Sequence, residues 1–298
     1  MFRGISFSDF VLYVEEHLLQ GWRETLTIRI ESICKNNGRT YTALLLQRED
    51  VLATPTIYLE DAYEVYQKTE DLEDAIVWIR TYYELSLLQM DEFTDFNLFD
   101  FEKVQDHIVY RLVNFEKNKE MLKDCPYIRL YDLAVTFRCV ISTTHGAISS
   151  TLIHNDLMDQ WKIGVEELTY LAQENTERLF PSMIRGISDV LSSSDHDSFV
   201  ENEMMYIATN EHSINGAGVI LYDGFLEEFA RNTKGDFYIL PSSIHEVILV
   251  PCQPGIFEED LKEMVCQANL EVVDEEEILS DSVYCYRKDQ GKIVCCAS

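Results

Sequence analysis

Residues 26–46 read LTIRIESICKNNGRTYTALLL, and this stretch decides the fold class. Apolar and polar residues alternate from Leu26 to Glu31, which is the period of a half-buried strand. Asn36-Asn37-Gly38 is a tight-turn signal, and Tyr41 to Leu46 predicts a returning strand. The stretch therefore predicts an antiparallel hairpin.

Further helices and strands are expected on both sides of this hairpin. Helical spacing predicts helices that begin near residues 8, 70, 165, 225 and 257, with Thr69 as the cap of the second. The segment after Pro55, TIYLEDAYEVY (56–66), predicts a short extended piece that runs into an acidic helix. Strand signals cover 108–115, 204–208, 237–240, 247–250, 283–286 and 292–295, and a second hairpin joins 131–142 to 148–154. Hairpins outnumber strand-helix-strand crossovers, so we expect an α+β fold with mixed, mostly antiparallel sheets and packed helices.

The length of 298 residues allows one large or two ordinary domains, at roughly 150 residues per domain. The segment SSSDHDSFVENE, residues 192–203, is the most polar and least periodic part of the chain. It is predicted to be a linker or loop between an N-terminal α+β region, 1–191, and a C-terminal α+β region, 204–298.

Charge is the most unusual feature of the composition. The chain has 53 acidic and 24 basic residues, for a formal net charge of -29. Nucleic-acid binding requires clustered Lys and Arg, and anionic membrane surfaces repel such a chain, so neither ligand is expected. The charge instead favours a basic protein partner, with solubility alone as the alternative.

Cellular location and redox state follow from further absences in the sequence. No uncharged run of signal-peptide or membrane-spanning length occurs, so we expect a cytoplasmic protein. The eight cysteines show no repeated metal-ligand spacing and are predicted to be reduced. The adjacent Cys295 and Cys296 are either a strand-end pair without a role or a site of metal binding or oxidation. No cofactor or metal is predicted.

Catalytic motifs are weak. Asn215-Gly216-Ala217-Gly218 lacks the spacing of a phosphate loop, and the second histidine of a zinc-protease motif would fall at Leu249. Ser243 and His245 lie close together in a turn between two predicted strands, which makes them the candidate catalytic residues. The same sequence is also consistent with a turn that has no function.

The acidic residues are concentrated in two parts of the chain. No Lys or Arg occurs between Arg185 and Arg231, and a second acidic run begins at Glu271. These runs are either solvated faces or docking surfaces. The binding-surface candidates are Asp195, Asp197, Glu201, Glu203, Asp274, Glu275, Glu276 and Glu277.

Several segments resemble an uncharacterised family of domains of unknown function found in gut clostridia. They are FDFEKVQDHIVYRLVNFEKNKEML (99–122), STLIHNDLMDQW (150–161), MMYIATN (204–210), GVILYDGFLEEFA (218–230) and DFYILPSSIHEVILVP (236–251). The middle and C-terminal thirds are more remotely similar to the YtpQ-like family, also functionally unassigned. The resemblance implies a cytoplasmic bacterial protein, with an accessory role in mobile elements, and supplies no catalytic residues.

Two hypotheses about function follow. The first is a non-catalytic intracellular protein whose acidic faces bind a basic protein partner, in its sharpest form by imitating nucleic acid. The alternative is a hydrolase or other enzyme whose site is assembled from distant residues around Ser243 and His245.

Overall fold

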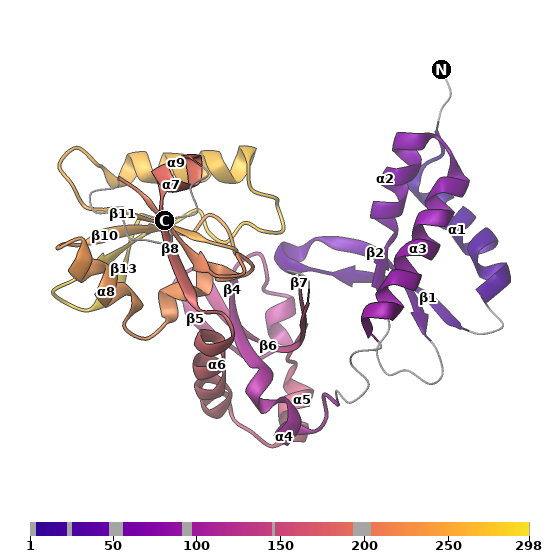
Figure 1. Ribbon diagram of the computed structural model, residues 1–298, viewed down its shortest axis with the longest axis horizontal. Helices are drawn as coiled ribbons and strands as arrows, with labels where there is room; N and C mark the ends of the chain where they lie inside the picture. Colours follow the sequence, from indigo (N-terminus) through magenta and orange to yellow (C-terminus); the bar gives the residue numbers. More distant parts are fainter. Residues whose placement is uncertain are drawn as a thin grey trace. The chain divides into compact units, whose positions relative to one another are not determined.

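The computed structural model describes residues 4–22, 26–47, 56–90, 97–144, 147–192 and 204–297. The chain divides into two compact units, which we describe separately (Figure 1). Unit 1 comprises Met1–Lys35 and Arg39–Asp95, and unit 2 comprises Asn36–Gly38 and Phe96–Ser298.

Unit 1 contains a three-stranded sheet and three helices. Its elements are α1 (Phe7–Trp22), β1 (Thr27–Cys34), β2 (Thr40–Gln47), β3 (Thr56–Tyr58), α2 (Leu59–Thr69) and α3 (Leu72–Met90). The strand order is β1-β2-β3. Strands β1 and β2 pair antiparallel from Thr27 opposite Gln47 to Cys34 opposite Thr40, which confirms the predicted hairpin.

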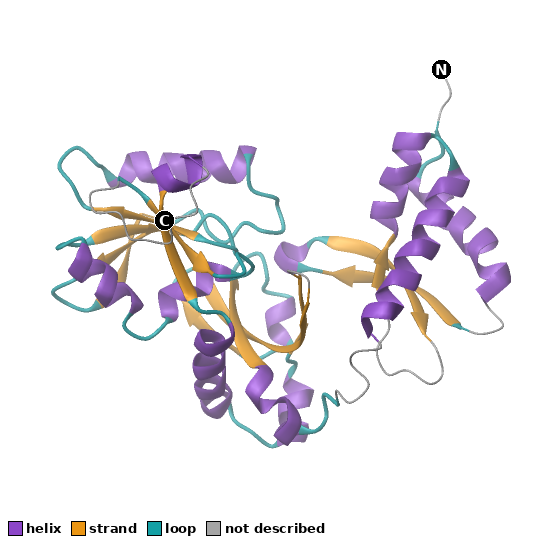
Figure 2. Ribbon diagram, viewed as in Figure 1, coloured by secondary structure: helices purple, strands orange, loops and turns teal. Residues whose placement is uncertain are grey.

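Helices and strands of unit 1 share one apolar core. Helices α1 and α3 lie beside the sheet (Figure 2). Their apolar residues at helical spacing share a core with residues of the sheet. The fully buried members include Phe10, Val14, Leu18, Leu44, Ile57 and Ile79. The predicted cap of α3 is wrong by two residues, because the carboxylate of Asp71, not the hydroxyl of Thr69, accepts the first-turn bond, from the backbone N–H of Glu73 at 2.9 Å.

Unit 2 begins with short helices and a four-stranded sheet. The elements are α4 (Phe101–Val104), β4 (Ile108–Asn114), β5 (Tyr127–Leu130), β6 (Leu133–Thr144), β7 (Ala147–Leu152), α5 (Asn155–Trp161) and α6 (Val165–Leu179). The long strand β6 pairs with β4, β5 and β7, all antiparallel. Its pairing with β7 confirms the second predicted hairpin.

A six-stranded sheet completes unit 2. Its elements are β8 (Ser182–Gly186), α7 (Ile187–Ser192), β9 (Tyr206–Asn210), the 3₁₀ helix η5 (Gly216–Leu221), α8 (Phe225–Asn232), β10 (Phe237–Leu240), β11 (Val247–Pro251), α9 (Glu258–Glu271), β12 (Val283–Arg287) and β13 (Lys292–Ala297). The strand order is β13-β12-β10-β11-β9-β8. Every strand pair in the described part of this sheet is antiparallel.

The six-stranded sheet is buried on both faces, and alternate residues of a strand belong to different cores. In β10, Phe237 and Ile239 join the main core with residues of β4, β6, α6 and α8. Tyr238 and Leu240 instead face α9, whose Leu261 and Val265 cover the other side of the sheet (Figure 1). This sandwich explains why the strands of this sheet are apolar at successive positions.

The fold class is confirmed as α+β with mostly antiparallel sheets. The unit boundary, however, falls next to Asp95 and not at the predicted linker 192–203. The physical reason is that β8 and β9, which flank this polar segment, pair with each other from Ser182 opposite Asn210 to Gly186 opposite Tyr206. Residues 193–203 themselves lie outside the described residues.

Within the ranges that the structure describes, every helix is too short or too polar to cross a bilayer.

Candidate functional site

The candidate Ser243 lies in the turn between β10 and β11. Its side chain is buried, with the residue 6% exposed, and its Oγ accepts a hydrogen bond from the backbone N–H of His245 at 3.0 Å. The next residue, Ile244, donates its N–H to the carbonyl of Glu277 at 2.9 Å. Ser243 is therefore part of a packed turn, and its hydroxyl stabilises that turn.

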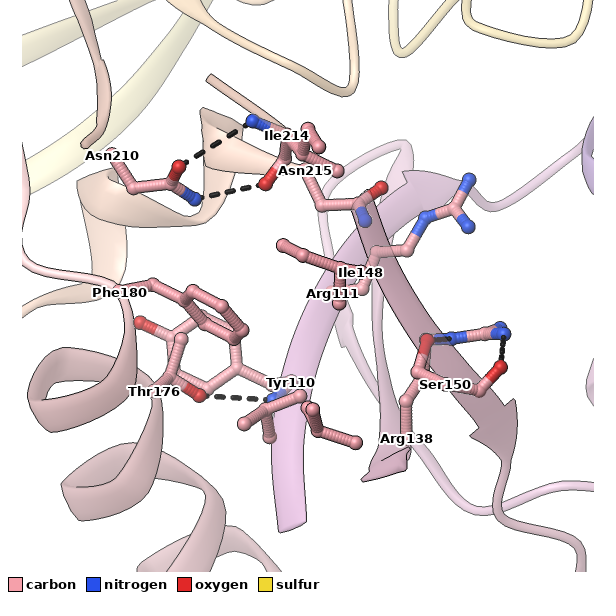
Figure 3. A pocket seen from close by; sticks show the side chains of 12 residues that line it. Tyr110, Arg111, Arg138, Ile148, Ser150, Thr176, Phe180, Asn210, Ile214 and Asn215 are labelled. Carbon is pink, nitrogen blue, oxygen red and sulfur yellow. Dashed lines mark hydrogen bonds between the residues drawn. The ribbon is translucent and has the colours of Figure 1, made fainter. Parts of the chain in front are cut away.

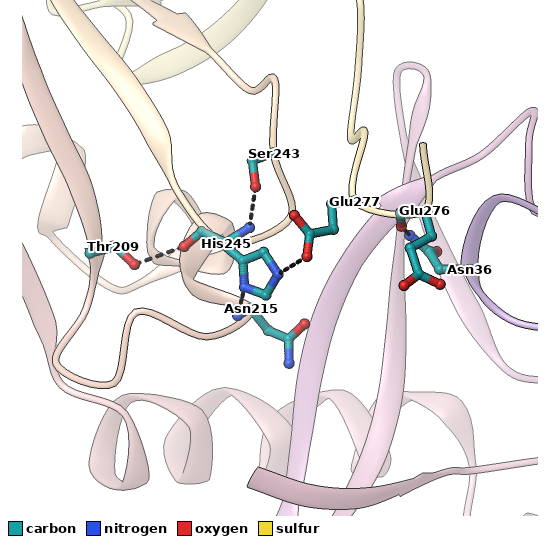
Figure 4. Close-up of polar contacts among 7 residues, drawn as sticks. All are labelled: Asn36, Thr209, Asn215, Ser243, His245, Glu276 and Glu277. Carbon is teal, nitrogen blue, oxygen red and sulfur yellow. Dashed lines mark hydrogen bonds and ion pairs between the residues drawn. The ribbon is translucent and has the colours of Figure 1, made fainter. Parts of the chain in front are cut away.

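The imidazole of His245 is held by groups from distant segments (Figure 4). Its Nδ1 accepts a hydrogen bond from the backbone N–H of Asn215 at 3.1 Å, so the neutral ring must have its proton on Nε2. That Nε2 lies 3.2 Å from Oε1 of Glu277 and donates to it. Both ring nitrogens thus have partners other than the Ser243 hydroxyl.

This geometry does not build a nucleophile and its base. A Ser–His pair needs the hydroxyl within about 3 Å of a ring nitrogen, and no such bond joins Ser243 to the His245 ring in the described structure. What the arrangement does is tie the turn at Ser243 to the segment that ends at Glu277. A catalytic role of the two residues stays a prediction.

The second acidic run, Asp274 to Glu277, forms a turn after α9. The backbone N–H of Glu277 donates to the carbonyl of Asp274 at 2.8 Å. Glu276 and Glu277 are half-buried, and the carbonyl of Glu276 accepts a bond from the Asn36 side chain at 2.5 Å within unit 2 (Figure 4). Asp274 and Glu275 are exposed, so only these two of the four candidates present free carboxylates at the surface.

The other four acidic candidates, Asp195, Asp197, Glu201 and Glu203, lie outside the described residues.

A surface feature that the sequence analysis missed lies at the end of α9. Leu270 is 86% exposed and Val272 is 82% exposed, which makes them the most exposed of the large apolar residues described. They flank Glu271 and precede Asp274 and Glu275, all of which are exposed. We call Leu270, Glu271, Val272, Asp274 and Glu275 the α9 patch. The sequence did contain a signal for this exposure, because Leu270 does not lie on the apolar face that the spacing predicts for this helix.

The second missed feature is a pocket in unit 2 with two arginines in its wall (Figure 3). Arg111 is the central residue of β4, and Arg138 lies in β6. Burial lowers the pKa of Arg138. Burial and, secondarily, the charge of Arg138 lower the pKa of Arg111 to about 9, and the charges of Glu276 and Glu277 oppose this shift in part. The signal in the sequence was an arginine inside each of two mostly apolar strands.

The adjacent cysteines of β13 point to opposite faces of its sheet. Cys295 packs against the main core, whereas Cys296 packs against the core under α9. Burial raises the pKa of Cys296 to about 11, so this thiol is protonated near neutral pH. Opposite orientations prevent the two sulfur atoms from holding one metal ion together. Among the described residues, no three or more metal-ligating side chains lie together in a way that could hold a metal ion.

The fold and these sites define an α+β protein with an apolar, acidic surface patch and an arginine-lined pocket. Comparison with known proteins adds its family. The model of a family of unknown function, DUF5688, matches residues 7–288, and the chain belongs to this family. No curated protein and no solved structure matches the chain.

Proposed function

We propose that the chain is a non-catalytic binding protein and that its α9 patch engages a basic protein partner. The observation that carries this proposal is the near-complete exposure of Leu270 and Val272 beside three exposed carboxylates. Large apolar side chains that protrude together among charged residues are typical of protein–protein contact sites. A cytoplasmic, bacterial setting, a clostridial origin and a link to the YtpQ-like family belong to the same proposal.

The charge of the α9 patch supports a cationic partner. The last turn of α9 has no basic residue, although cations are the side chains that stabilise the negative end of a helix dipole. Glu271 lies at this end, where its charge adds to that of the dipole, and Asp274 and Glu275 follow directly. A Lys or Arg side chain of a partner would complement this field.

The apolar residues favour a protein over imitation of nucleic acid. In the α9 patch, Leu270 and Val272 are interspersed with the carboxylates, whereas a phosphate row has no apolar members. We therefore propose that the partner contributes an apolar contact ringed by basic groups. The hydrolase alternative has no comparable observation in its favour.

Capture of partners from native lysate tests this proposal. The full chain is compared with the double variant Leu270→Ser/Val272→Ser at low and at moderate salt. We expect the wild type to retain a basic protein and the variant to lose about tenfold or more of its affinity, since interface anchors typically contribute over 1 kcal/mol each. The matched control is Leu12→Ser, because Leu12 is an exposed leucine on α1, 57% accessible, outside the α9 patch.

The electrostatic part of the proposal has its own pair of variants. Asp274→Lys/Glu275→Lys reverses two charges of the α9 patch, and Glu15→Lys/Glu16→Lys reverses two exposed charges of α1. We expect only the first pair to abolish capture. The proposal is wrong if no basic protein is retained at either salt concentration, or if both pairs weaken capture equally.

A further inference from the structure

The two arginines of the pocket project from the same face of the four-stranded sheet. In the register of β4 and β6, Val109 lies opposite Arg138 and Arg111 lies opposite Thr136. Side chains two residues apart on a strand share a face, so Arg111 and Arg138 lie diagonally across the pair. Two positive charges are thus placed together in a chain of net charge -29.

The two guanidinium groups differ in their partners (Figure 3). Arg138 donates from Nε to the Ser150 hydroxyl at 2.9 Å and from Nη2 to the Ser150 carbonyl at 2.8 Å. The Arg111 guanidinium makes no hydrogen bond or ion pair with the residues that the structure describes, and its Nε is buried without a partner. A buried ionic donor without an acceptor is strongly unfavourable, so the site is incomplete as it stands.

Carboxylates near the pocket do not complete it. Glu276 and Glu277 exert an electrostatic effect on Arg111, but neither forms an ion pair with it among the described contacts. Glu277 already accepts the Nε2–H of His245. The donors of Arg111 therefore remain available for an anion from outside the chain.

The shape of the pocket limits the size of that anion. Its enclosed space is small, about 20 Å³, and the rest of the pocket is open to solvent. That inner space exceeds the room for one water only slightly. Beside the arginines, the wall is formed by apolar side chains, among them Val140, Ile148 and Phe180, and by four polar residues, Ser150, Thr176, Asn210 and Asn215.

We propose that this pocket binds the carboxylate of a small monocarboxylic acid, with Arg111 as the principal donor and Arg138 as the second. A guanidinium pairs with a flat carboxylate through two parallel hydrogen bonds. The inner space holds little more than one water, so the short hydrocarbon tail extends into the open part of the pocket. A phosphate dianion fits less well, because it is bulkier and the nearby Glu276 and Glu277 repel it more strongly. This site is independent of the α9 patch.

Calorimetric titration of the full chain tests the proposal. The probes are sodium butyrate, the neutral butyramide and inorganic phosphate, at an ionic strength held constant with sodium chloride. We expect saturable binding of butyrate, none of butyramide, and weaker binding of phosphate. Arg111→Gln should weaken butyrate binding about tenfold or more, because hydrogen bonds to charged groups contribute roughly 1.5–3 kcal/mol.

Two further variants keep the result interpretable. Arg129→Gln removes a positive charge from an exposed position on β5, and we expect it to bind butyrate within about twofold of wild type, like other surface substitutions. Arg111→Met replaces the charged side chain with an unbranched apolar one. We expect this variant to fold and to show no saturable binding of butyrate. The proposal is overturned by no saturable binding of butyrate up to about 10 mM, by tighter binding of phosphate, or by unchanged butyrate binding in both Arg111 variants.

Discussion

Replacing Arg111 by methionine should stabilise the ligand-free protein, although most substitutions in a buried strand destabilise. The guanidinium has no hydrogen-bond or ion-pair partner among the described residues, and its Nε is fully enclosed. Methionine is flexible and apolar, and it can fill much of the same volume. Substitution of buried ionic groups by apolar ones is often neutral or stabilising by about 1–4 kcal/mol.

The pKa of Arg111 sets an upper limit for this effect. A decrease from 12.5 to about 9 corresponds to at most about 5 kcal/mol of unfavourable free energy for the charged form. Although its Nε is enclosed, Arg111 as a whole is only half-buried, so solvent screening reduces this figure substantially. We expect Arg111→Met to raise the free energy of unfolding by about 1–2 kcal/mol, or the melting temperature by about 2–8 °C.

The pH dependence has a definite sign. The pKa of Arg111 is lower in the folded than in the unfolded state, so the unfolded chain binds more protons between pH 9 and 12.5. The penalty is complete below about pH 9, and the wild type should regain stability relative to Arg111→Met as the pH rises above 9. Denaturant unfolding of both proteins at pH 7 and at pH 10 measures this change, with Arg129→Met as the exposed control. A variant that is destabilised by 1 kcal/mol or more at pH 7 would refute the reasoning.

Three other substitutions test the described packing, each by thermal or denaturant unfolding. Asp132→Asn should cost about 2–4 kcal/mol, because the Asp132 carboxylate accepts bonds from the hydroxyls of Ser280, Ser282 and Tyr284, and a stability equal to wild type would contradict this network. Gly216→Ala should cost about 2 kcal/mol or more, because the new Cβ would lie 2.6 Å from the His245 carbonyl, whereas Gly235→Ala meets nothing within 4 Å and should change little. Leu270→Ser should leave stability within about 0.5 kcal/mol of wild type, and a larger loss would mean that Leu270 packs within the chain.

Local pattern was sufficient for most of the individual elements. The hairpin of β1 and β2 followed from alternation and the Asn-Gly turn, where Asn37 and Gly38 adopt the left-handed φ values of 58° and 73° that such turns require. Helices α6, α8 and α9 followed from apolar spacing. Strands β5 and β8 and helix α5 were not predicted, because short and partly exposed elements have weak periodicity.

The unit boundary depends on pairing between segments, which composition does not report. A polar stretch such as 192–203 predicts exposure, but its composition does not indicate whether the strands before and after it belong to one sheet. The pairing of β8 with β9 decides that question here.

The candidate site illustrates the same limit. The proximity of Ser243 and His245 in the chain is real, yet the orientation of the imidazole is determined by Asn215 and Glu277, which lie far away in the sequence. Likewise, the sequence shows that Arg111 and Arg138 each lie within a mostly apolar strand. That the two share a sheet face depends on the register of β4 and β6.

Site-specific cross-linking tests the central claim, that the chain binds a basic partner through the α9 patch, most directly. A photo-reactive residue is introduced as Leu270→p-benzoylphenylalanine, and Leu12→p-benzoylphenylalanine is the matched control at another exposed leucine. In the native host, we predict an ultraviolet-dependent adduct with a basic protein from position 270 and none from position 12. The absence of an adduct at position 270, or the same adduct from both positions, would contradict the claim.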